Sequence, residues 1–396
     1  RRQRQMCIRD SYYSVVAGWC LRYFAASVQG GLSGESSTAF WERYAGSGLA
    51  WVTNAIALSL AIGVVWFGVR GIEKVAKILI PSLFVLVLML AIRAVTLPGA
   101  SAGLEFLFRP DWSALGDVRI WLQALTQNAW DTGAGWGLIL TFAVYMKARE
   151  DIPLNAFLIG FGNNSVSLLA GIMVLCTVFA INPGARNEIV GAGNEGLTFI
   201  WMPQLFAQMP GGRFFMMFFF LALSFAALTS LISMVELLTR NLMDAGLERR
   251  KAVGIVALLA LAFSTPSALS LSFLHNQDWV WGVGLVLSGL LYAVAARRFG
   301  VERLRRKVVN SDGCDLPVGS WWTFIVSVVV PIEAVVLMIW FLWEARGADP
   351  AHWLDPFKSG SVGTVLAQWA VVLVALFVLN RWLGRRLGTE GDLSDA

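Results

Sequence analysis

The residues best suited to chemistry lie inside an apolar stretch, where a carboxylate is followed by three glycines at alternate positions. Asp131 precedes Gly133, Gly135 and Gly137 within 119–146. A carboxylate near the middle of a membrane span costs about 2.5–3.5 kcal/mol on insertion scales, and each glycine lowers helix propensity by about 1 kcal/mol relative to alanine. We expect a helix that breaks here and frees backbone groups to line a cavity, as at the ion sites of many secondary transporters. The alternative is a packing Asp131, with glycines for close helix approach.

Two further polar clusters interrupt apolar runs. Asn163 is one of two adjacent asparagines, and Thr229 and Ser230 follow small residues in a later run. Amide and hydroxyl oxygens suit hard cations, so these groups could combine with backbone carbonyls as a neutral oxygen cage for sodium. The two hydroxyls could equally bond back to their own helix, which is the commoner arrangement.

The composition indicates that these residues lie on helices that span a membrane. The 396-residue chain is 57% hydrophobic and 14% charged, against about 45–50% and about 25% in soluble domains. A span needs about 20 apolar residues. Ten runs qualify: 11–30, 48–69, 73–98, 119–146, 152–182, 212–239, 250–268, 277–297, 319–344 and 361–384.

Several classes of function are disfavoured by the same composition. The net charge of +5 comes from basic residues between apolar runs, which does not suggest a nucleic-acid partner. The chain has no phosphate-binding Gly-x-x-x-x-Gly-Lys run and no histidine-based catalytic cluster, and its four cysteines are scattered. We therefore expect that the protein is not an enzyme and has no organic cofactor. Its expected partners are the lipid bilayer and a small-molecule substrate. The sequence leaves the oligomeric state open.

Lys and Arg in the loops predict the orientation. One alternate set of loops carries eighteen of these residues and the other carries eight. Cytoplasmic loops hold the excess of positive charge, so the C-terminus is expected on the cytoplasmic side. The protein is expected to be a multi-pass protein of the cell (inner) membrane. The outer segments 99–118 and 183–211 are long and rich in Gly, Pro and aromatic residues, which favours a lid over an outer vestibule.

Beyond these features, the chain resembles the neurotransmitter:sodium symporter family, whose bacterial members mostly carry amino acids. The resemblance runs through nearly all of the chain and depends on the order and spacing of several motifs. They are Tyr12-Tyr13 with Trp19, the basic stretch Gly71 to Lys77, Pro110-Asp111-Trp112, Thr126-Gln127 with Gly-x-Gly-x-Gly, Asn163 to Ser167, Ala226 to Ser230, and Gln277-Asp278-Trp279.

The resemblance implies a role for each matching residue. The substrate site would comprise Tyr13, whose hydroxyl meets the substrate carboxylate, with Trp130, Trp136, Ser230 and Met234. The coupling ion would be Na⁺, held at one site by Asp131 and Asn163 and at a second by Ala226, Thr229 and Ser230. Asp278 would belong to an outer gate, and Asp244 with Tyr145 to an inner one.

The resemblance also implies an all-α, five-helix inverted-repeat transporter fold whose sixth span is broken. The chain would form a single transmembrane domain over 1–396, with a complete second repeat at 119–298. The order of the matches implies that the sequence starts inside the family's third span, without the first two. Residues 1–11 do not resemble the start of that span, because they hold four Arg, an Asp and few apolar residues, and they are interpreted as not native. A chain without those helices is expected to be inactive by itself.

The implied function is sodium-coupled symport of a small amino acid or amino-acid-like solute by alternating access. Animal members of the family have Ser at the position of Asp131 and need chloride near the equivalents of Gln127 and Ser167. A fixed carboxylate supplies a similar negative charge, so we expect chloride independence. Two alternatives stay open: a proton-coupled amino-acid transporter of the same broken-helix plan, and a sensor that binds ligand without moving it. A channel has no supporting filter segment or ring of charges.

Overall fold

The computed structural model describes residues 7–32, 37–131, 133, 135–146, 150–311 and 314–386, and within these ranges it contains helices and no strands. Seven helical segments are long and apolar enough to cross a membrane. They are α3 (Gly48–Trp66), α4 (Gly68–Val95), α8 (Ile152–Ile181), α12 (Gly212–Asp244), α13 (Arg249–Leu269), α14 (Leu271–Phe299) and the continuous run Ser320–Gly347.

The run Ser320–Gly347 changes its winding on the way. It begins as α16 (Ser320–Phe324), continues as a π-helical turn over Ile325–Val329 and returns to α-helix in α17 (Val330–Ala348). Pro331 directly follows the π-helical turn; because proline cannot donate a backbone hydrogen bond inside a continuous helix, a change of winding at this point is expected.

Three of the ten expected spans differ from a single apolar helix. The stretch 119–146 is divided between α6 (Val118–Asp131) and α7 (Leu138–Ala143). The last span, α18 (Val362–Arg386), is mainly apolar as far as Leu379 and then carries Asn380, Arg381, Arg385 and Arg386. The first, α1 (Cys7–Gln29), is a regular helix but too polar to qualify as an apolar span.

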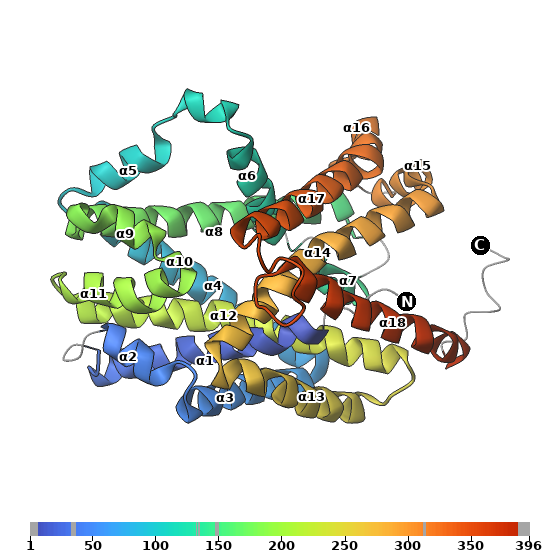
Figure 1. The fold of residues 1–396 in the computed structure, drawn as a ribbon, viewed down its shortest axis with the longest axis horizontal. Coiled ribbons are helices and arrows are strands. Elements are labelled where there is room, and N and C mark those ends of the chain that lie inside the picture. Colours follow the sequence, from blue (N-terminus) through green and yellow to red (C-terminus); the bar gives the residue numbers. More distant parts are fainter. Residues whose placement is uncertain are drawn as a thin grey trace.

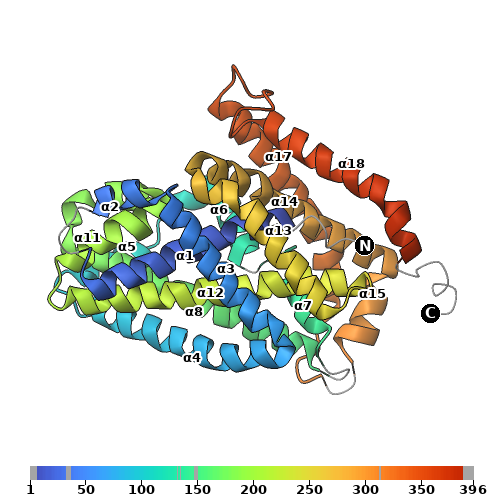
Figure 2. The ribbon, with the colours of Figure 1, turned by 90° about the horizontal axis from the view of Figure 1, so that it is seen from below.

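The polarity of α1 is explained by its central position. Val15, Trp19 and Tyr23 on this helix are almost fully buried, and α1 packs against α3, α12, α13 and α14. Both ribbon views show it inside the bundle (Figures 1 and 2). A helix surrounded by protein can carry polar groups that other helices satisfy, so its sequence need not be apolar on every face.

Peripheral helices show the opposite pattern. Of an apolar 18-residue stretch in each helix, only 17% is buried within the protein in α4 and 11% in Ser320–Gly347, against 44% in α12. Their exposed side chains are mostly Leu, Ile, Val and Phe. Such surfaces are stable against lipid, so α4 and α17 form part of the outer wall of the bundle.

Short helices cover the two ends of the bundle. At one end lie α2 (Ser37–Tyr44), α5 (Ala100–Phe108), α9 (Arg186–Gly191), α10 (Gly193–Glu195), the π-helical Gly196–Trp201 and α11 (Met202–Ala207), with 3₁₀ turns at Trp112–Gly116 and Pro183–Ala185. They gather at the left of Figure 1, whereas α15 (Val301–Leu304) and the π-helical Arg305–Val309 lie at the right.

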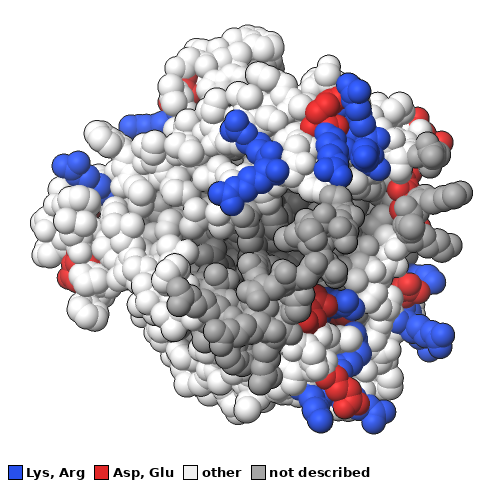
Figure 3. Space-filling view, turned by 90° about the vertical axis from the view of Figure 1, so that its right-hand side faces the viewer, with Lys and Arg blue, Asp and Glu red and all other residues white. Residues whose placement is uncertain are grey.

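The end that carries α15 is also the basic end. Figure 3 views the molecule from this side and shows several groups of Lys and Arg around its rim. Glu302 organises one group: its carboxylate accepts hydrogen bonds from Arg305 at 2.5 Å and Arg306 at 2.6 Å, and from Thr323 of α16 at 2.7 Å. The Arg305 guanidinium, then Thr323 and Arg306, hold the pKa of this carboxyl well below its usual range. Glu302 thus joins the end of α14 to the start of the next span.

Candidate binding site at the broken helix

The helix break lies where the alternate glycines predicted it. α6 ends at Asp131 and α7 begins at Leu138, and Gly133, Gly135 and Gly137 adopt φ values of +63°, +80° and +77°. Side chains other than glycine rarely adopt this left-handed region. The segment turns through a hydrogen bond from the Trp136 N–H to the Gly133 carbonyl at 3.1 Å.

Close contact with α14 holds the break in place. A Cβ atom on Gly135 would lie 2.4 Å from the Leu285 carbonyl oxygen and 2.7 Å from the Gly289 nitrogen. Trp136 and Leu138 pack against the buried Leu237 of α12 and against Leu285. The glycine therefore serves both as a turn and as a contact between two backbones.

Two of the expected site residues end the first half of this helix. Trp130 and Asp131 are the last residues of α6. Their side chains lie outside the described part of the structure, as do Thr132 and Ala134. Asp131 thus stands, by its backbone, at the C-terminal end of a half-helix, where partial negative charge and free carbonyls favour a cation.

The asparagine cluster lies in the middle of α8. Asn163 is half-buried, and its Nδ2 atom is buried with no hydrogen-bond partner among the described residues. Ser165 donates to its own helix at the Phe161 carbonyl, 2.8 Å away, and Ser167 is exposed. Because an unpaired buried amide is costly, Asn163 is the member of this cluster that is available to a ligand.

On α12 the two hydroxyls differ. The Thr229 hydroxyl donates to the Ala226 carbonyl at 2.9 Å, which is the back-bonded arrangement. Ser230 is half-buried and makes no hydrogen bond with other described residues. Met234 is fully buried one turn further along. A hydroxyl that donates to its own helix keeps its lone pairs as acceptors, so Thr229 still offers an oxygen to a cation.

At the outer end, Asp278 of α14 accepts a hydrogen bond from Tyr12 of α1 at 2.7 Å. The neighbouring Tyr13, expected in the substrate site, is half-buried and packs against the main core. The sequence alone gave Tyr12 no role of its own, although the Tyr-Tyr pair places two phenols on different faces of the same helix. The contact connects α1 with α14 near the expected outer gate.

The inner end contains an ion pair that no sequence motif indicates. Glu236 of α12 is completely buried and pairs with Arg249 of α13, with N–O distances of 2.5 and 3.1 Å. Tyr145 donates to the same carboxylate at 2.7 Å. Asp244 instead pairs with Arg240 at 2.9 Å, and that guanidinium lies 5.7 Å from the centre of the Tyr145 ring. The two expected inner-gate residues are therefore connected through Arg240.

The outer segment 183–211 is attached to α14 as well. The His275 Nε2 atom lies 3.0 Å from both carboxylate oxygens of Glu195. Phe199 of the same segment stacks on Trp41 of α2, with ring centroids 5.2 Å apart. These contacts attach the segment to α14 and α2 at one end of the bundle; that it forms a lid over an outer vestibule stays a prediction.

Comparison with known proteins places these features in context. A family model described as the sodium:neurotransmitter symporter family matches residues 45–385. An uncharacterized sodium-dependent transporter of Methanocaldococcus jannaschii is 30% identical over 94% of this chain and 78% of its own length. The sodium-dependent serotonin transporter of Drosophila melanogaster is 24% identical over 94% of this chain and 67% of its own length.

A solved structure resembles the fold. The crystal structure of MhsT in complex with L-phenylalanine superposes with a TM-score of 0.73 at 27% identity, over 85% of this chain and 78% of that one. The helix break and the helices packed around it thus occur in a chain whose architecture matches a solved structure.

Proposed function

Because this chain belongs to the sodium:neurotransmitter symporter family, a family of multi-pass membrane transporters and not of enzymes, we propose that it carries a small amino acid or amino-acid-like solute together with Na⁺. The observation that carries the proposal is the break between Asp131 and Leu138, which exposes backbone groups in the middle of a membrane span. Helix breaks of this kind form ion and substrate sites in transporters.

The first sodium site combines Asp131 with Asn163. The negative end of α6 and the carboxylate of Asp131 attract a cation. The unpaired Asn163 amide supports the assignment, since a flip of the side chain exchanges its nitrogen for its oxygen. The second site uses Ala226, Thr229 and Ser230 of α12, whose carbonyl and hydroxyl oxygens lie within about one turn of the helix. Both sites use neutral oxygens apart from Asp131.

The substrate binds between α1 and the broken helix. Tyr13 offers a hydroxyl to the substrate carboxylate, and Trp130, Trp136, Ser230 and Met234 shape the remaining pocket. Trp136 packs beside Leu285 and Met234 is buried on α12, which supports an apolar surround. The name of the solved relative includes L-phenylalanine, an amino acid that such an apolar and aromatic surround would suit.

Alternating access then requires that the two ends open in turn. Asp278 with Tyr12 closes the outer end, and the Tyr145, Glu236 and Arg249 cluster with Asp244 and Arg240 closes the inner end. Sodium binding at the break would order the two half-helices. The ion gradient would thereby determine which of the two gates is closed.

The test is uptake of a labelled amino-acid mixture into liposomes that contain the protein with the two upstream spans expected from the family resemblance restored, with an inward sodium gradient compared with an equal potassium gradient. Asp131→Ala is assayed alongside. We expect accumulation with sodium only, and its loss in the variant. Accumulation that is indifferent to sodium would instead support a proton-coupled transporter, and saturable binding without accumulation would support a sensor.

Chloride independence is a separate prediction about Asp131. Since its fixed carboxylate supplies negative charge near Gln127 and Ser167, replacing chloride by gluconate should leave sodium-driven uptake unchanged. Asp131→Ser, which removes that charge, should make uptake respond to chloride if it stays active. Strong chloride dependence of the unmodified protein would contradict the prediction.

A further inference from the structure

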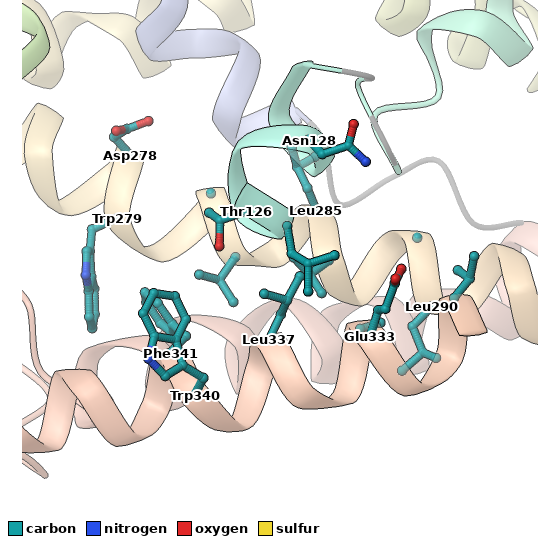
Figure 4. Close-up of a pocket in the computed structure, with 17 residues that line it drawn as sticks. Thr126, Asn128, Asp278, Trp279, Leu285, Leu290, Glu333, Leu337, Trp340 and Phe341 are labelled. Carbon is teal, nitrogen blue, oxygen red and sulfur yellow. The ribbon is translucent and has the colours of Figure 1, made fainter. Parts of the chain in front are cut away.

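One face of the run Ser320–Gly347 is apolar and exposed along its whole length. Figure 4 shows the opposite face: Glu333, Leu337 and Phe341 of α17 lie toward α14, beside the hollow between the two helices. The exposed face has a large apolar side chain at every third or fourth position. This apolar stripe begins at Trp321 and ends at Trp343, with Phe324, Val328, Ile332, Val335 and Ile339 between them. A stripe of this kind on the outer wall of a membrane protein is covered by the acyl chains of lipids.

The two tryptophans at the ends of the apolar stripe indicate its depth in the membrane. Trp321 and Trp343 are 58% and 71% exposed. Their separation of 22 residues corresponds to about 33 Å of helix, and the hydrocarbon core of a bilayer is about 30 Å thick. Tryptophan is enriched at the boundary between acyl chains and headgroups. Trp321 therefore lies at the level of the lipid headgroups on the basic side of the protein.

The basic segment after α14 lies at the same depth as Trp321. Within 297–307, six residues are Arg or Lys and one, Glu302, is acidic. Glu302 accepts a hydrogen bond at 2.7 Å from Thr323, which lies two residues after Trp321. At this corner α15 packs against α16 (Figure 1). The hydrogen bond thus holds the cations beside the place where lipid headgroups begin.

Two arginines that pair with Glu302 differ in what they leave available. Arg305 is mostly buried, pairs with Glu302 at 2.5 Å and donates to the Val318 carbonyl at 2.8 Å, so its role is structural. Arg306 is 72% exposed, and within the described residues it bonds to Glu302 only through its Nε atom. The Glu302 carboxylate therefore orients the Arg306 guanidinium and leaves its two terminal NH₂ groups available to an anion.

Arg303 and Lys307 add two exposed cations to the same corner. They lie three residues before and one residue after Arg306, and residues three or four apart in a helical segment share a face. Within the described residues neither has an acidic partner. The Arg303 guanidinium lies 5.2 Å from the ring centre of the exposed Phe299. These cations lie beyond the last turn of α14, so the negative end of that helix does not account for them.

We propose that the corner between α15 and α16 binds the headgroup of one anionic phospholipid, whose acyl chains lie along the apolar stripe. Arg303, Arg306 and Lys307 donate to the phosphate, and the planar fork of Arg306 matches its oxygens. Clusters of Lys and Arg directly beside a span are typical of sites for anionic lipids. The inference goes beyond the proposed transport, because none of these residues belongs to the sodium sites, the substrate site or the gates.

The test is native mass spectrometry of the delipidated protein in a neutral detergent, titrated with phosphatidylglycerol or with phosphatidylcholine of the same acyl chains. We expect one phosphatidylglycerol to bind about tenfold or more tightly than phosphatidylcholine. The triple variant Arg303→Gln, Arg306→Gln, Lys307→Gln should lose this preference, because the phosphate then meets no cation at the corner.

The matched control removes the same charge from another helix that faces lipid. Arg70→Gln, Lys74→Gln, Lys77→Gln changes three exposed cations of α4 and should leave the preference for phosphatidylglycerol unchanged. An equal loss in both triple variants would overturn the proposal, because it would show general attraction between charges and no defined site.

A second pair of variants tests where the lipid lies. Trp321→Ala should weaken phosphatidylglycerol binding several-fold, whereas Trp343→Ala, at the other end of the apolar stripe, should not. Glycerol phosphate, a soluble headgroup without acyl chains, should not bind in the same titration. Equal effects of the two tryptophan variants, or binding of glycerol phosphate as tight as that of the lipid, would overturn the proposal. The assay requires no transport, so its result is independent of whether sodium-driven uptake is found.

Discussion

At the scale of single residues, the most constrained group is Glu236. Its side chain is completely buried and is satisfied by Arg249 and Tyr145 from two other elements. A buried charge of this kind contributes little net stability while it is paired, but it becomes very unfavourable when one partner is removed. Arg249 also donates to the Val65 carbonyl of α3 at 2.9 Å, so one ion pair connects α12, α13, α3 and the segment after α7.

The first prediction follows from this burial. Arg249→Met should lower the free energy of unfolding by about 3–5 kcal/mol, because it leaves a buried carboxylate without its cation. The double variant Arg249→Met with Glu236→Met should recover much of that loss. Thermal denaturation in detergent would measure both, with Glu248→Gln as an exposed control. A double variant that is no more stable than the single one would contradict the explanation.

A second residue-scale prediction concerns Asp151, which lies before α8 on the basic side. Its carboxylate accepts hydrogen bonds from the backbone N–H groups of Leu154 at 3.0 Å and Asp315 at 2.6 Å, and these bonds lower its pKa. A carboxyl whose pKa is lowered by folding stabilises the protein above its ordinary pKa, and that contribution is lost as the pH falls through the lowered value.

The melting temperature should therefore fall in acid more steeply in the unmodified protein than in Asp151→Asn, which lacks the titrating group. The measurement is a series of melting curves between about pH 3 and pH 7, the range that includes the ordinary pKa of Asp. Glu344→Gln, on the exposed face of α17, should show the unmodified profile. Identical pH profiles for all three proteins would exclude Asp151 as a contributor.

Single residues also show where reasoning from sequence stops. Asp278 was assigned to a gate only through the family resemblance of Gln277-Asp278-Trp279, and its partner Tyr12 lies 266 residues away and has no local signal. Glu236 looks like an ordinary helical residue until α13 brings Arg249 to it. Partners across helices depend on tertiary packing, which local patterns do not encode.

At the scale of elements, the most informative segment is the break between α6 and α7. The glycines predicted it because they disfavour helix continuation, and their positive φ values show the physical reason. Span lengths were equally predictable from hydropathy, because lipid imposes the same requirement on every exposed helix. The polar α1 was harder to identify as a span from hydropathy, because a helix that is buried by other helices need not be apolar on every face.

The break itself supplies the third prediction. Gly135→Ala should destabilise the protein by about 2–4 kcal/mol, because the methyl group would collide with the Leu285 carbonyl and because φ is +80°. Gly160→Ala in α8 is the matched control: no atom from beyond its own helix backbone lies within 4 Å of the place its methyl group would take, and helix propensity favours alanine. Melting temperatures and sodium affinity measure the two effects, and equal behaviour of both variants would contradict the role of the α14 contact.

At the scale of the whole molecule, charge defines an axis. Lys and Arg gather at the end that carries α15, while the segment 183–211 and α2 occupy the other end. The orientation with the basic end in the cytoplasm is our proposal, and it follows from the positive-inside rule.

Site-directed labelling tests that orientation. In a variant without native cysteines, Lys358→Cys should react with a membrane-impermeant maleimide in intact cells, whereas Arg306→Cys should react only after the membrane is opened. Both native side chains are exposed, at 42% and 72%, so accessibility from the aqueous phase is similar. The reverse labelling pattern would invert the proposed topology.

The Glu302 cluster has a consequence for how the bundle moves. Because it joins the end of α14 to α16 and hence to α17, those helices would move together whenever the protein changes conformation.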